Sequence, residues 1–361
     1  MRAVLLLEDG RRFDGVGFGA EATRVGEAVF NTAMSGYQEV LTDPSYAEQV
    51  VCMTAPMIGN TGVNLVDRES SRIWPSGFII RELSPRPSNF RSEGTLHDEL
   101  AHFGVPGLAG IDTRALTQHL RTHGAQRCVV STTTFDTEHL AAQIAAWPGM
   151  AGRALAAEVG CKARYVYHDP AQPTWRVALL DGGAKGNILS LLAETGAYVR
   201  VHPIDDAPEA IAQDVDAIFV SNGPGDPAAL PTTIANLRAL LGKKPMVGIC
   251  LGHQLLALAA GATTYKLKFD HRGANQPVRD ERTGRVEITS QNHGFAVDRA
   301  ALEAIGGEVT HTHLNDGTVS GFWHRGLRLF AVQYHPESNP GPHDSRHLFQ
   351  QYRDFALGVL G

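Results

Sequence analysis

Cysteine is scarce in this sequence, and its spacing suggests neither a crosslink nor a bound metal. The four cysteines among the 361 residues are scattered, with no C-x-x-C pair. We therefore expect no disulfide framework and no structural zinc site. The 16 histidines include no H-E-x-x-H sequence, so we expect no metal site of any other kind on this chain.

Long apolar runs and an excess of basic charge are also absent. The first apolar run, Ala3 to Leu7, is too short for a signal sequence, and no run approaches the roughly 20 residues of a membrane helix. The formal net charge is −6, and no basic stripe follows the chain. We expect a cytoplasmic protein with neither a membrane nor a nucleic-acid partner.

What is present is a change of rhythm near residue 174, which predicts two domains. Residues 1–150 carry short strand-like runs, turns and a few helices, and they predict a separate N-terminal α/β domain. Residues 151–173 are poorly periodic and favour a connection between domains. From 174 to 361, apolar strands alternate with helices, as in an α/β fold with a doubly wound, mostly parallel sheet. The stretch from Val278 to Val332 is richer in strands and should add antiparallel ones.

A cysteine lies where such a sheet would place a reactive residue. Gly248-Ile-Cys250-Leu-Gly252 joins a predicted strand to a predicted helix and has the G-x-nucleophile-x-G form of a nucleophile elbow. At a helix start, free backbone N–H groups favour a thiolate, and the N–H of Leu251 could hold an oxyanion. The alternative is that Cys250 is a buried core residue, as free cysteines usually are. The motif by itself leaves both interpretations open.

A thiol nucleophile needs a base, and two histidines could serve. His253 follows Cys250 by three residues, and helical side chains point back toward the helix start. His335 follows a predicted strand, Leu329 to Gln333, and Glu337 two residues later could fix its tautomer. The residues alone allow either histidine, or neither if His335 and Glu337 form an ordinary surface turn.

Three motifs in order resemble those of the class I (triad) glutamine amidotransferases. They are the loop Ser221-Asn-Gly-Pro-Gly-Asp226, the cysteine elbow and the turn His335-Pro-Glu337. Over the whole chain, the sequence resembles the glutamine-hydrolysing small subunits of carbamoyl-phosphate synthases. This closer resemblance rests on the segments Phe30 to Tyr46, Ile58 to Gly62, Gly110 to Thr117, His271 to Val278 and Gln291 to Val297. It implies a flavodoxin-like amidotransferase domain that follows a domain peculiar to the small subunit.

The resemblance implies a role for each motif residue. Cys250 would attack the side-chain amide of glutamine. His335, backed by Glu337, would take the thiol proton and protonate the leaving ammonia. The N–H groups of Gly223 and Leu251 would hold the oxyanion. The implied glutamine-binding residues are Ser45, Gly223, Gly225, Leu251, Gln254, Asn292, Gly294 and Phe295.

Two of these assignments have local alternatives, and one position departs from the family. Ser45-Tyr-Ala-Glu48 matches a helix capping box, which is compatible with a serine meeting a carboxylate at a domain interface. Asn292-His-Gly294 could equally be a hairpin turn. Asp270 stands where the family usually has glycine, just before H-R-G-A-N-Q-P, and it leaves the shape of that loop open.

The chain lacks the motifs needed to use ammonia. No P-loop is present, because Gly242-Lys-Lys has no glycine at the right offset upstream and no Ser or Thr after it. Asp181-Gly-Gly-Ala-Lys185 opens a helix, where we favour a tight strand-to-helix turn over an anion site. Since free ammonia would be protonated in water, the resemblance implies a docked large synthetase subunit that receives it by a shielded path. ATP, Mg²⁺ and bicarbonate are expected on that partner, and no cofactor is expected on this chain. The carbamoyl phosphate made by the pair would serve pyrimidine and arginine biosynthesis.

Two other functions compete with this one. An amidotransferase feeding a different synthetase is disfavoured by the N-terminal motifs. A non-catalytic glutamine sensor is disfavoured by the intact set of Cys250, His335 and Glu337, which a sensor would be free to lose.

Overall fold

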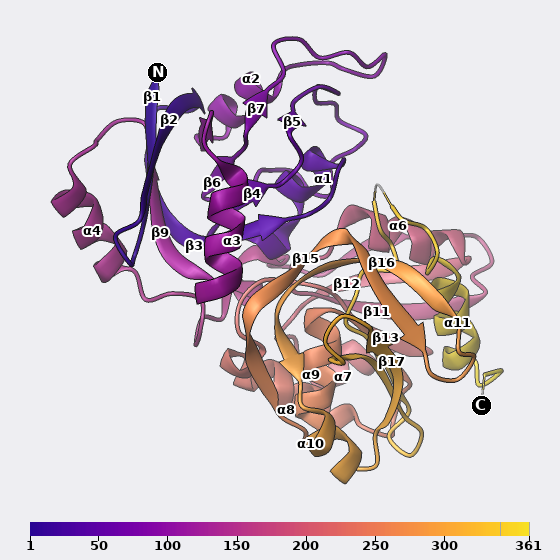
Figure 1. The fold of residues 1–361 in the computed structure, drawn as a ribbon. Coiled ribbons are helices and arrows are strands. Elements are labelled where there is room, and N and C mark those ends of the chain that lie inside the picture. Colours follow the sequence, from indigo (N-terminus) through magenta and orange to yellow (C-terminus); the bar gives the residue numbers. More distant parts are fainter. Residues whose placement is uncertain (340, 361) are drawn as a thin grey trace. The chain divides into compact units, whose positions relative to one another are not determined.

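The computed structural model describes residues 1–339 and 341–360 and divides the chain into two compact units. Unit 1 comprises Met1–Ala151 and Lys268–Arg272, and unit 2 comprises Gly152–Leu267 and Gly273–Gly361. Figure 1 shows the elements of both units along the chain. In the described part, no helix combines the length and the apolar character needed to cross a membrane.

Unit 1 is built around a closed sheet of seven strands. In spatial order these are β1 (Arg2–Leu7), β2 (Arg12–Gly19), β8 (Pro106–Ala109), β6 (Gly77–Ile79), β4 (Gln49–Met53), β3 (Thr23–Asn31) and β9 (Gln126–Ser131). The neighbours β3, β4, β6 and β8 pair in parallel, and the other pairs are antiparallel. Alternate side chains point inward, so Leu5, Val50 and Ile79 meet in one core with two of the cysteines, Cys52 and Cys128.

Short helices and a small strand pair complete unit 1. They are α1 (Tyr37–Thr42), η1 (Pro44–Tyr46), α2 (Leu96–His102), α3 (Thr113–His123) and α4 (Thr137–Ala146), with β5 (Met57–Ile58) paired to β7 (Glu82–Leu83). Helix α3 packs on β3 and β4. It begins after Asp112, whose side chain accepts a hydrogen bond from the N–H of Ala115 at 2.9 Å, and it ends at Gly124 with φ 98°. Leu116 and Leu120 are buried one turn apart, which leaves the opposite face of α3 to solvent.

Unit 2 contains a ten-stranded sheet. In spatial order its strands are β10 (Tyr165–His168), β12 (Ala197–Pro203), β11 (Trp175–Asp181), β13 (Ala217–Val220), β14 (Met246–Ile249), β19 (Leu329–Val332), β18 (Val319–His324), β17 (Glu308–His313), β15 (Thr264–Asp280) and β16 (Val286–Val297). From β12 to β19 each strand is parallel to its neighbour, whereas β10, β18 and β17 add antiparallel pairs. The predicted mostly parallel sheet with antiparallel additions is confirmed.

The helices of unit 2 follow its strands in alternation. They are α5 (Leu155–Val159), α6 (Gly186–Glu194), α7 (Pro208–Ala212), η2 (Pro227–Ala229), α8 (Pro231–Leu240), α9 (Leu251–Ala260), α10 (Arg299–Ala304) and α11 (His347–Ala356). Helix α9 has nearly all of its residues buried, because it packs against β13, β14, β16 and β19 and against α8.

The order of the parallel strands indicates where a ligand would bind. Numbered along the sequence, these strands lie in the flavodoxin-like order 2-1-3-4-5. Sheets of this kind bind ligands outside the carboxyl ends of their strands, near the point where the order reverses. That point lies between β11 and β13, and β14 is the next strand. The loops after these three strands carry Lys185, Gly223 and Cys250.

Two stretches contain helices or strands that the sequence did not predict. The stretch 151–173, expected to be a connection, contains α5 and β10, and β10 pairs with β12 inside unit 2. His271 to Val278, expected to be a loop, lies within β15. These residues are mostly polar or small and show no period of two, so their strand comes from tertiary pairing.

A five-residue piece of β15 belongs to unit 1. The carbonyl of Lys268 accepts a hydrogen bond from the N–H of Ala125 at 3.2 Å, and that of Arg272 accepts one from Thr32 at 3.3 Å. Asp270 is buried here, with its carboxylate 2.6 Å from the guanidinium of Arg272. The residue that departs from the family pattern is therefore a charge partner of a buried arginine.

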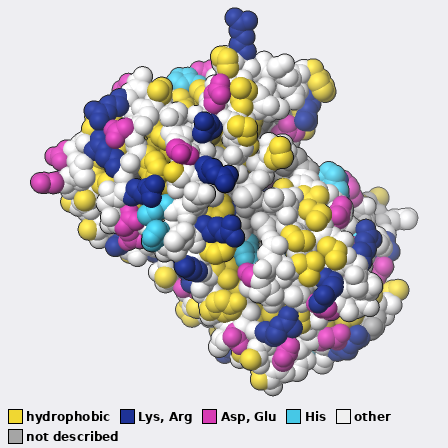
Figure 2. All heavy atoms as spheres, viewed as in Figure 1, with side chains coloured by type: hydrophobic (Ala, Val, Ile, Leu, Met, Phe, Trp, Pro, Cys, Tyr) yellow, Lys and Arg dark blue, Asp and Glu magenta, His cyan; other side chains and the backbone are white. Residues whose placement is uncertain are grey.

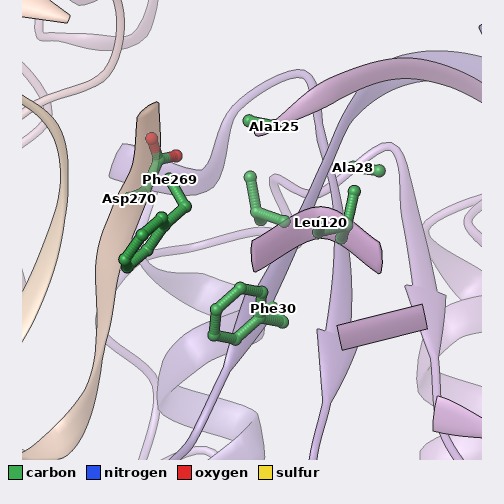
Figure 3. A pocket seen from close by; sticks show the side chains of 7 residues that line it. Ala28, Phe30, Leu120, Ala125, Phe269 and Asp270 are labelled. Atoms are coloured by element: carbon green, nitrogen blue, oxygen red, sulfur yellow. The ribbon is translucent and has the colours of Figure 1, made fainter. Parts of the chain in front are cut away.

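Figure 3 shows a small hollow beside this piece of β15. It is lined by Ala28, Val29, Phe30, Leu120, Ala125, Phe269 and Asp270. Its volume is about 10 Å³, the space that one water molecule needs. The hollow is therefore a packing feature of unit 1, too small for a substrate.

Candidate active site

Cys250 lies on a strained turn between β14 and α9. Its φ is 54° and its ψ is −103°, a conformation that residues other than glycine rarely adopt. The glycines on either side make the turn possible. A Cβ on Gly248 would lie 2.7 Å from the carbonyl carbon of Gly252, and a Cβ on Gly252 would lie 2.0 Å from the carbonyl oxygen of Val220. The local geometry is that of a nucleophile elbow.

Backbone N–H groups lie next to this turn. The N–H of Leu251 is the first of α9 and so has no acceptor within the helix. Gly223 lies beside it, because a Cβ on Gly223 would be 2.9 Å from the Leu251 side chain and 2.1 Å from the carbonyl oxygen of Gly182. The structure thus places Gly223 against the side chain of Leu251, the residue that follows Cys250.

His335 and Glu337 form a buried pair. His335 Nδ1 is 2.6 Å from Glu337 Oε1, and the two side chains are 1% and 0% exposed. The N–H of His335 donates to the carbonyl of Ser290 at 2.9 Å, which fixes the residue beside β16. The other ring nitrogen, Nε2, is buried and has no hydrogen-bond partner among the described residues. Cys250 is close enough to influence the charge of this ring, so the three predicted catalytic residues lie together.

A lysine that the sequence analysis did not assign to the site contacts this pair. Lys185 Nζ lies 2.7 Å from Glu337 Oε1, and its side chain is 7% exposed. It sits in the turn after β11, where Asp181 accepts hydrogen bonds from two backbone N–H groups at 2.8 and 2.9 Å. Asn187 donates to the carbonyl oxygen of Glu337 at 2.6 Å, across 150 positions of sequence. The expected tight turn is present, but nothing in the local sequence predicted the contacts of Lys185 and Asn187 with Glu337.

The charges of this cluster set its protonation states. Burial raises the pKa of Glu337, but Lys185 and His335 outweigh burial, and the pKa of Glu337 lies below its usual value. Burial lowers the pKa of His335, and so does the charge of Lys185. Glu337 and Cys250 raise it, and their effect is the larger, so the pKa of His335 lies well above its usual value. The site therefore favours an ionised Glu337 and a protonated His335.

Several residues implied to bind glutamine lie around α9 and β16. Gln254 donates from Nε2 to the carbonyl of Phe295 at 2.8 Å and to Gln333 Oε1 at 3.0 Å. Asn292, Gly294 and Phe295 all lie within β16, so the alternative of a hairpin turn there is wrong. The carbonyl oxygen of Asn292 lies 3.5 Å from the sulfur of the cysteine elbow. No motif predicted the contact between Gln254 and Gln333.

Gly225 and Ser45 occupy different surroundings. Gly225 has φ 94°, and a Cβ there would lie 2.5 Å from the carbonyl oxygen of Arg153. Ser45 is buried in unit 1 within η1. The capping box expected there is wrong, because Asp43 caps η1 by accepting from the N–H of Ser45 at 2.9 Å. Glu48, the other half of that expected box, accepts instead from the indole N–H of a tryptophan in unit 1 at 3.1 Å.

His253, the alternative base, is a core residue. Its ring lies 5.1 Å from that of Phe322, and it is fully buried in α9. Burial lowers the pKa of His253 to about 3, so the ring is neutral near pH 7. The other groups that influence its charge are Gln333 and His311.

Two family models together match most of the chain. Residues 5–130 match the carbamoyl-phosphate synthase small chain, CPSase domain, and residues 178–355 match the glutamine amidotransferase class-I family.

Full-length relatives agree with these models. The chain is 48% identical to the carbamoyl phosphate synthase small chain of Syntrophotalea carbinolica over 98% of this chain and 97% of the relative. It is 49% identical to that of Nostoc sp. over 98% and 94%, and 50% identical to that of Symbiobacterium thermophilum over 96% of each. The chain therefore belongs to the carbamoyl-phosphate synthase small-chain family and carries a class I glutamine amidotransferase domain.

Proposed function

We propose that this chain is the glutamine-hydrolysing subunit of a carbamoyl phosphate synthase. Relatives matched over 96% or more of their length are named carbamoyl phosphate synthase small chain, and in this chain a small-chain segment precedes an amidotransferase segment. The observation that carries the chemistry is the strained Cys250 beside the buried pair of His335 and Glu337.

The proposed reaction proceeds through a thioester on Cys250. The thiolate forms a bond to the side-chain amide carbon of glutamine while the carbonyl electron pair moves onto oxygen, which accepts hydrogen bonds from Gly223 and Leu251. The proton on His335 passes to the amide nitrogen, the C–N bond breaks and ammonia leaves. His335 then takes a proton from a water whose oxygen attacks the thioester, and glutamate and the thiolate are released. Glu337 holds the imidazole in one tautomer throughout.

Glutamine would be held by residues on several elements. We assign this binding to Ser45, Gly223, Gly225, Leu251, Gln254, Asn292, Gly294 and Phe295. The short distances around Gly223 and Gly225 are to the protein's own backbone, so the loop that would meet the substrate keeps its shape only with glycine at these positions. The role of Ser45, which belongs to unit 1, rests on the family resemblance alone.

The released ammonia would pass to a large synthetase subunit. That partner would bind ATP, Mg²⁺ and bicarbonate and make carbamoyl phosphate for pyrimidine and arginine biosynthesis in the cytoplasm. In this arrangement residues 1–150 form the small-subunit domain and 174–361 the amidotransferase domain, and residues 151–173 connect them through α5 and the edge strand β10.

Replacing the proposed nucleophile tests the chemistry. Cys250→Ser should lower the rate of glutamine hydrolysis at least about a thousandfold, because the serine hydroxyl is a far weaker nucleophile at neutral pH. Glutamine should still raise the melting temperature of the variant. Cys161→Ser, at a half-exposed cysteine outside this cluster, is the matched control and should keep its activity. Retained hydrolysis in Cys250→Ser would rule out the nucleophile assignment.

Purification from the source cell tests the partner. We expect a large ATP-dependent subunit to co-purify, and the complex to make carbamoyl phosphate from glutamine, bicarbonate and ATP. Co-purification of only a different synthetase would show that this amidotransferase serves another acceptor.

A further inference from the structure

Helix α3 carries polar side chains that neither the core nor the proposed catalytic set uses. Arg114, Gln118 and Arg121 are spaced by four and three residues, so they share one exposed face of the helix. Within residues 1–339 and 341–360, the guanidinium groups of both arginines have no hydrogen bond, ion pair or ring contact. Figure 2 shows Lys and Arg side chains, in dark blue, exposed on the face of unit 1 where Figure 1 places α3.

These three side chains border a cavity of about 330 Å³, which we call the α3 cavity. The rest of its lining consists of four threonines, Thr32, Thr54, Thr113 and Thr117. The first two follow the carboxyl ends of the parallel neighbours β3 and β4, and the last two lie one turn apart on α3. The carboxyl ends of parallel strands are a usual place for ligands.

The lining residues are all polar by type and carry a net positive charge, although methyl and methylene groups form much of the surface. The lining contains two arginines and no acidic or apolar residue. The N-terminal end of α3, where Thr113 and Arg114 lie, adds the positive end of the helix dipole. Guanidinium forks and hydroxyl groups donate hydrogen bonds to oxyanions. A phosphoryl group, with three terminal oxygens, can engage both arginines at once, whereas a carboxylate has only two oxygens. The hydroxyls of Thr32 and Thr117 already donate to the backbone carbonyls of Arg272 and Thr113.

The size of the cavity limits the ligand further. On the measure by which the small hollow beside β15 holds one water in about 10 Å³, this cavity of about 330 Å³ has room for many waters. That is more than a phosphoryl group alone requires. We propose that the α3 cavity binds a phosphate monoester of a small polar metabolite, with the phosphoryl group held by Arg114 and Arg121 and the organic part against the threonines. This site is additional to glutamine hydrolysis, and none of its residues belongs to the catalytic set.

Titration calorimetry of the full chain with ribose 5-phosphate, inorganic phosphate and ribose tests the proposal. We expect ribose 5-phosphate to bind, inorganic phosphate to bind more weakly, and ribose not to bind at matched ionic strength. Arg114→Gln and Arg121→Gln should each weaken ribose 5-phosphate at least about tenfold, because each removes a charge-assisted hydrogen-bond donor. Thr54→Val should weaken it less. Arg86→Gln, which also removes an exposed cation of unit 1, is the matched control and should not change the affinity.

Glutamine hydrolysis measured without phosphate should be unchanged in all of these variants, which shows that they fold. Equal affinity for ribose and ribose 5-phosphate would overturn the proposal, and so would full affinity in an Arg114→Gln/Arg121→Gln double variant. It would also be overturned if the wild type bound no phosphate compound while the double variant lost co-elution with the synthetase subunit. That result would make this face a docking surface for an acidic partner.

Discussion

At the scale of single residues, the site is a row of alternating charges. The imidazolium of His335, the carboxylate of Glu337 and the ammonium of Lys185 follow one another, with Cys250 next to the imidazolium, and each charge stabilises its neighbours. All four side chains are buried, so water screens these interactions only weakly. The removal of one member should change the protonation of the next.

Lys185→Met tests this coupling. Burial alone raises the pKa of Glu337, and without Lys185 that pKa should rise from its present low value. The carboxylate would then take up a proton at higher pH, and its hold on His335 would be lost as the pH falls through that higher pKa. We expect glutamine hydrolysis to slow at least about tenfold and the acid limb of the kcat/KM profile to move to higher pH.

The control for this variant is Lys243→Met, at an exposed lysine in the turn after α8. It removes the same charge and should leave both the rate and the pH profile unchanged. An acid limb in Lys185→Met at the wild-type position would show that the ion pair does not set the protonation of Glu337.

At the scale of elements, the site depends on the close approach of α9 to the sheet. The N–H of Gly252 donates to the carbonyl of Ser221 at 3.0 Å, at the end of β13. The N–H of Cys250 donates to the carbonyl of Val332 at 2.9 Å, at the end of β19. These bonds hold the first turn of α9 between the strands on either side of β14, which positions both the sulfur and the N–H of Leu251.

Gly252→Ala tests this approach. Its Cβ would lie 2.0 Å from the carbonyl oxygen of Val220, so α9 must shift away from β13. We expect the free energy of unfolding to fall by about 3 kcal/mol, measured by urea denaturation, together with a loss of glutamine hydrolysis. Gly326→Ala is the matched control, because the nearest atom to its Cβ would be 3.7 Å away. Equal stabilities of the two variants would contradict the steric argument.

At the scale of the whole molecule, unit 1 is not built from one continuous stretch of the sequence. Unit 1 ends at Ala151 but regains Lys268–Arg272 from the middle of β15. The carbonyl groups of this returning piece accept hydrogen bonds from the N–H groups of Ala125 and Thr32. Its Phe269 side chain lines the small hollow beside the core of unit 1.

A fragment of residues 1–151 should therefore be less stable than unit 1 in the full chain. We expect amide hydrogens of β3 and β9 to exchange faster in the fragment, as followed by mass spectrometry, because unit 1 loses these bonds and contacts. Appending residues 266–274 through a flexible Gly/Ser linker should restore part of the protection. Equal protection in the fragment and the full chain would show that the returning piece contributes nothing to stability.

The sequence by itself determined the features that depend on neighbours in the chain. The alternation of apolar strands and helices predicted the α/β domain, and Gly248 to Gly252 was expected to join a strand to a helix, as it does between β14 and α9. The glycines around Cys250 predicted its strained turn, because only residues without a Cβ fit there.

Only the tertiary structure decided the features that depend on distant residues. It placed Lys185 against Glu337, put His335 rather than His253 beside a carboxylate, and made strands of polar stretches that locally resemble a loop and a turn. The physical reason is that burial and pairing across about 150 positions set these charges and strands. The periodicity and the spacing of the residues do not show which pairs of distant side chains will be buried against each other.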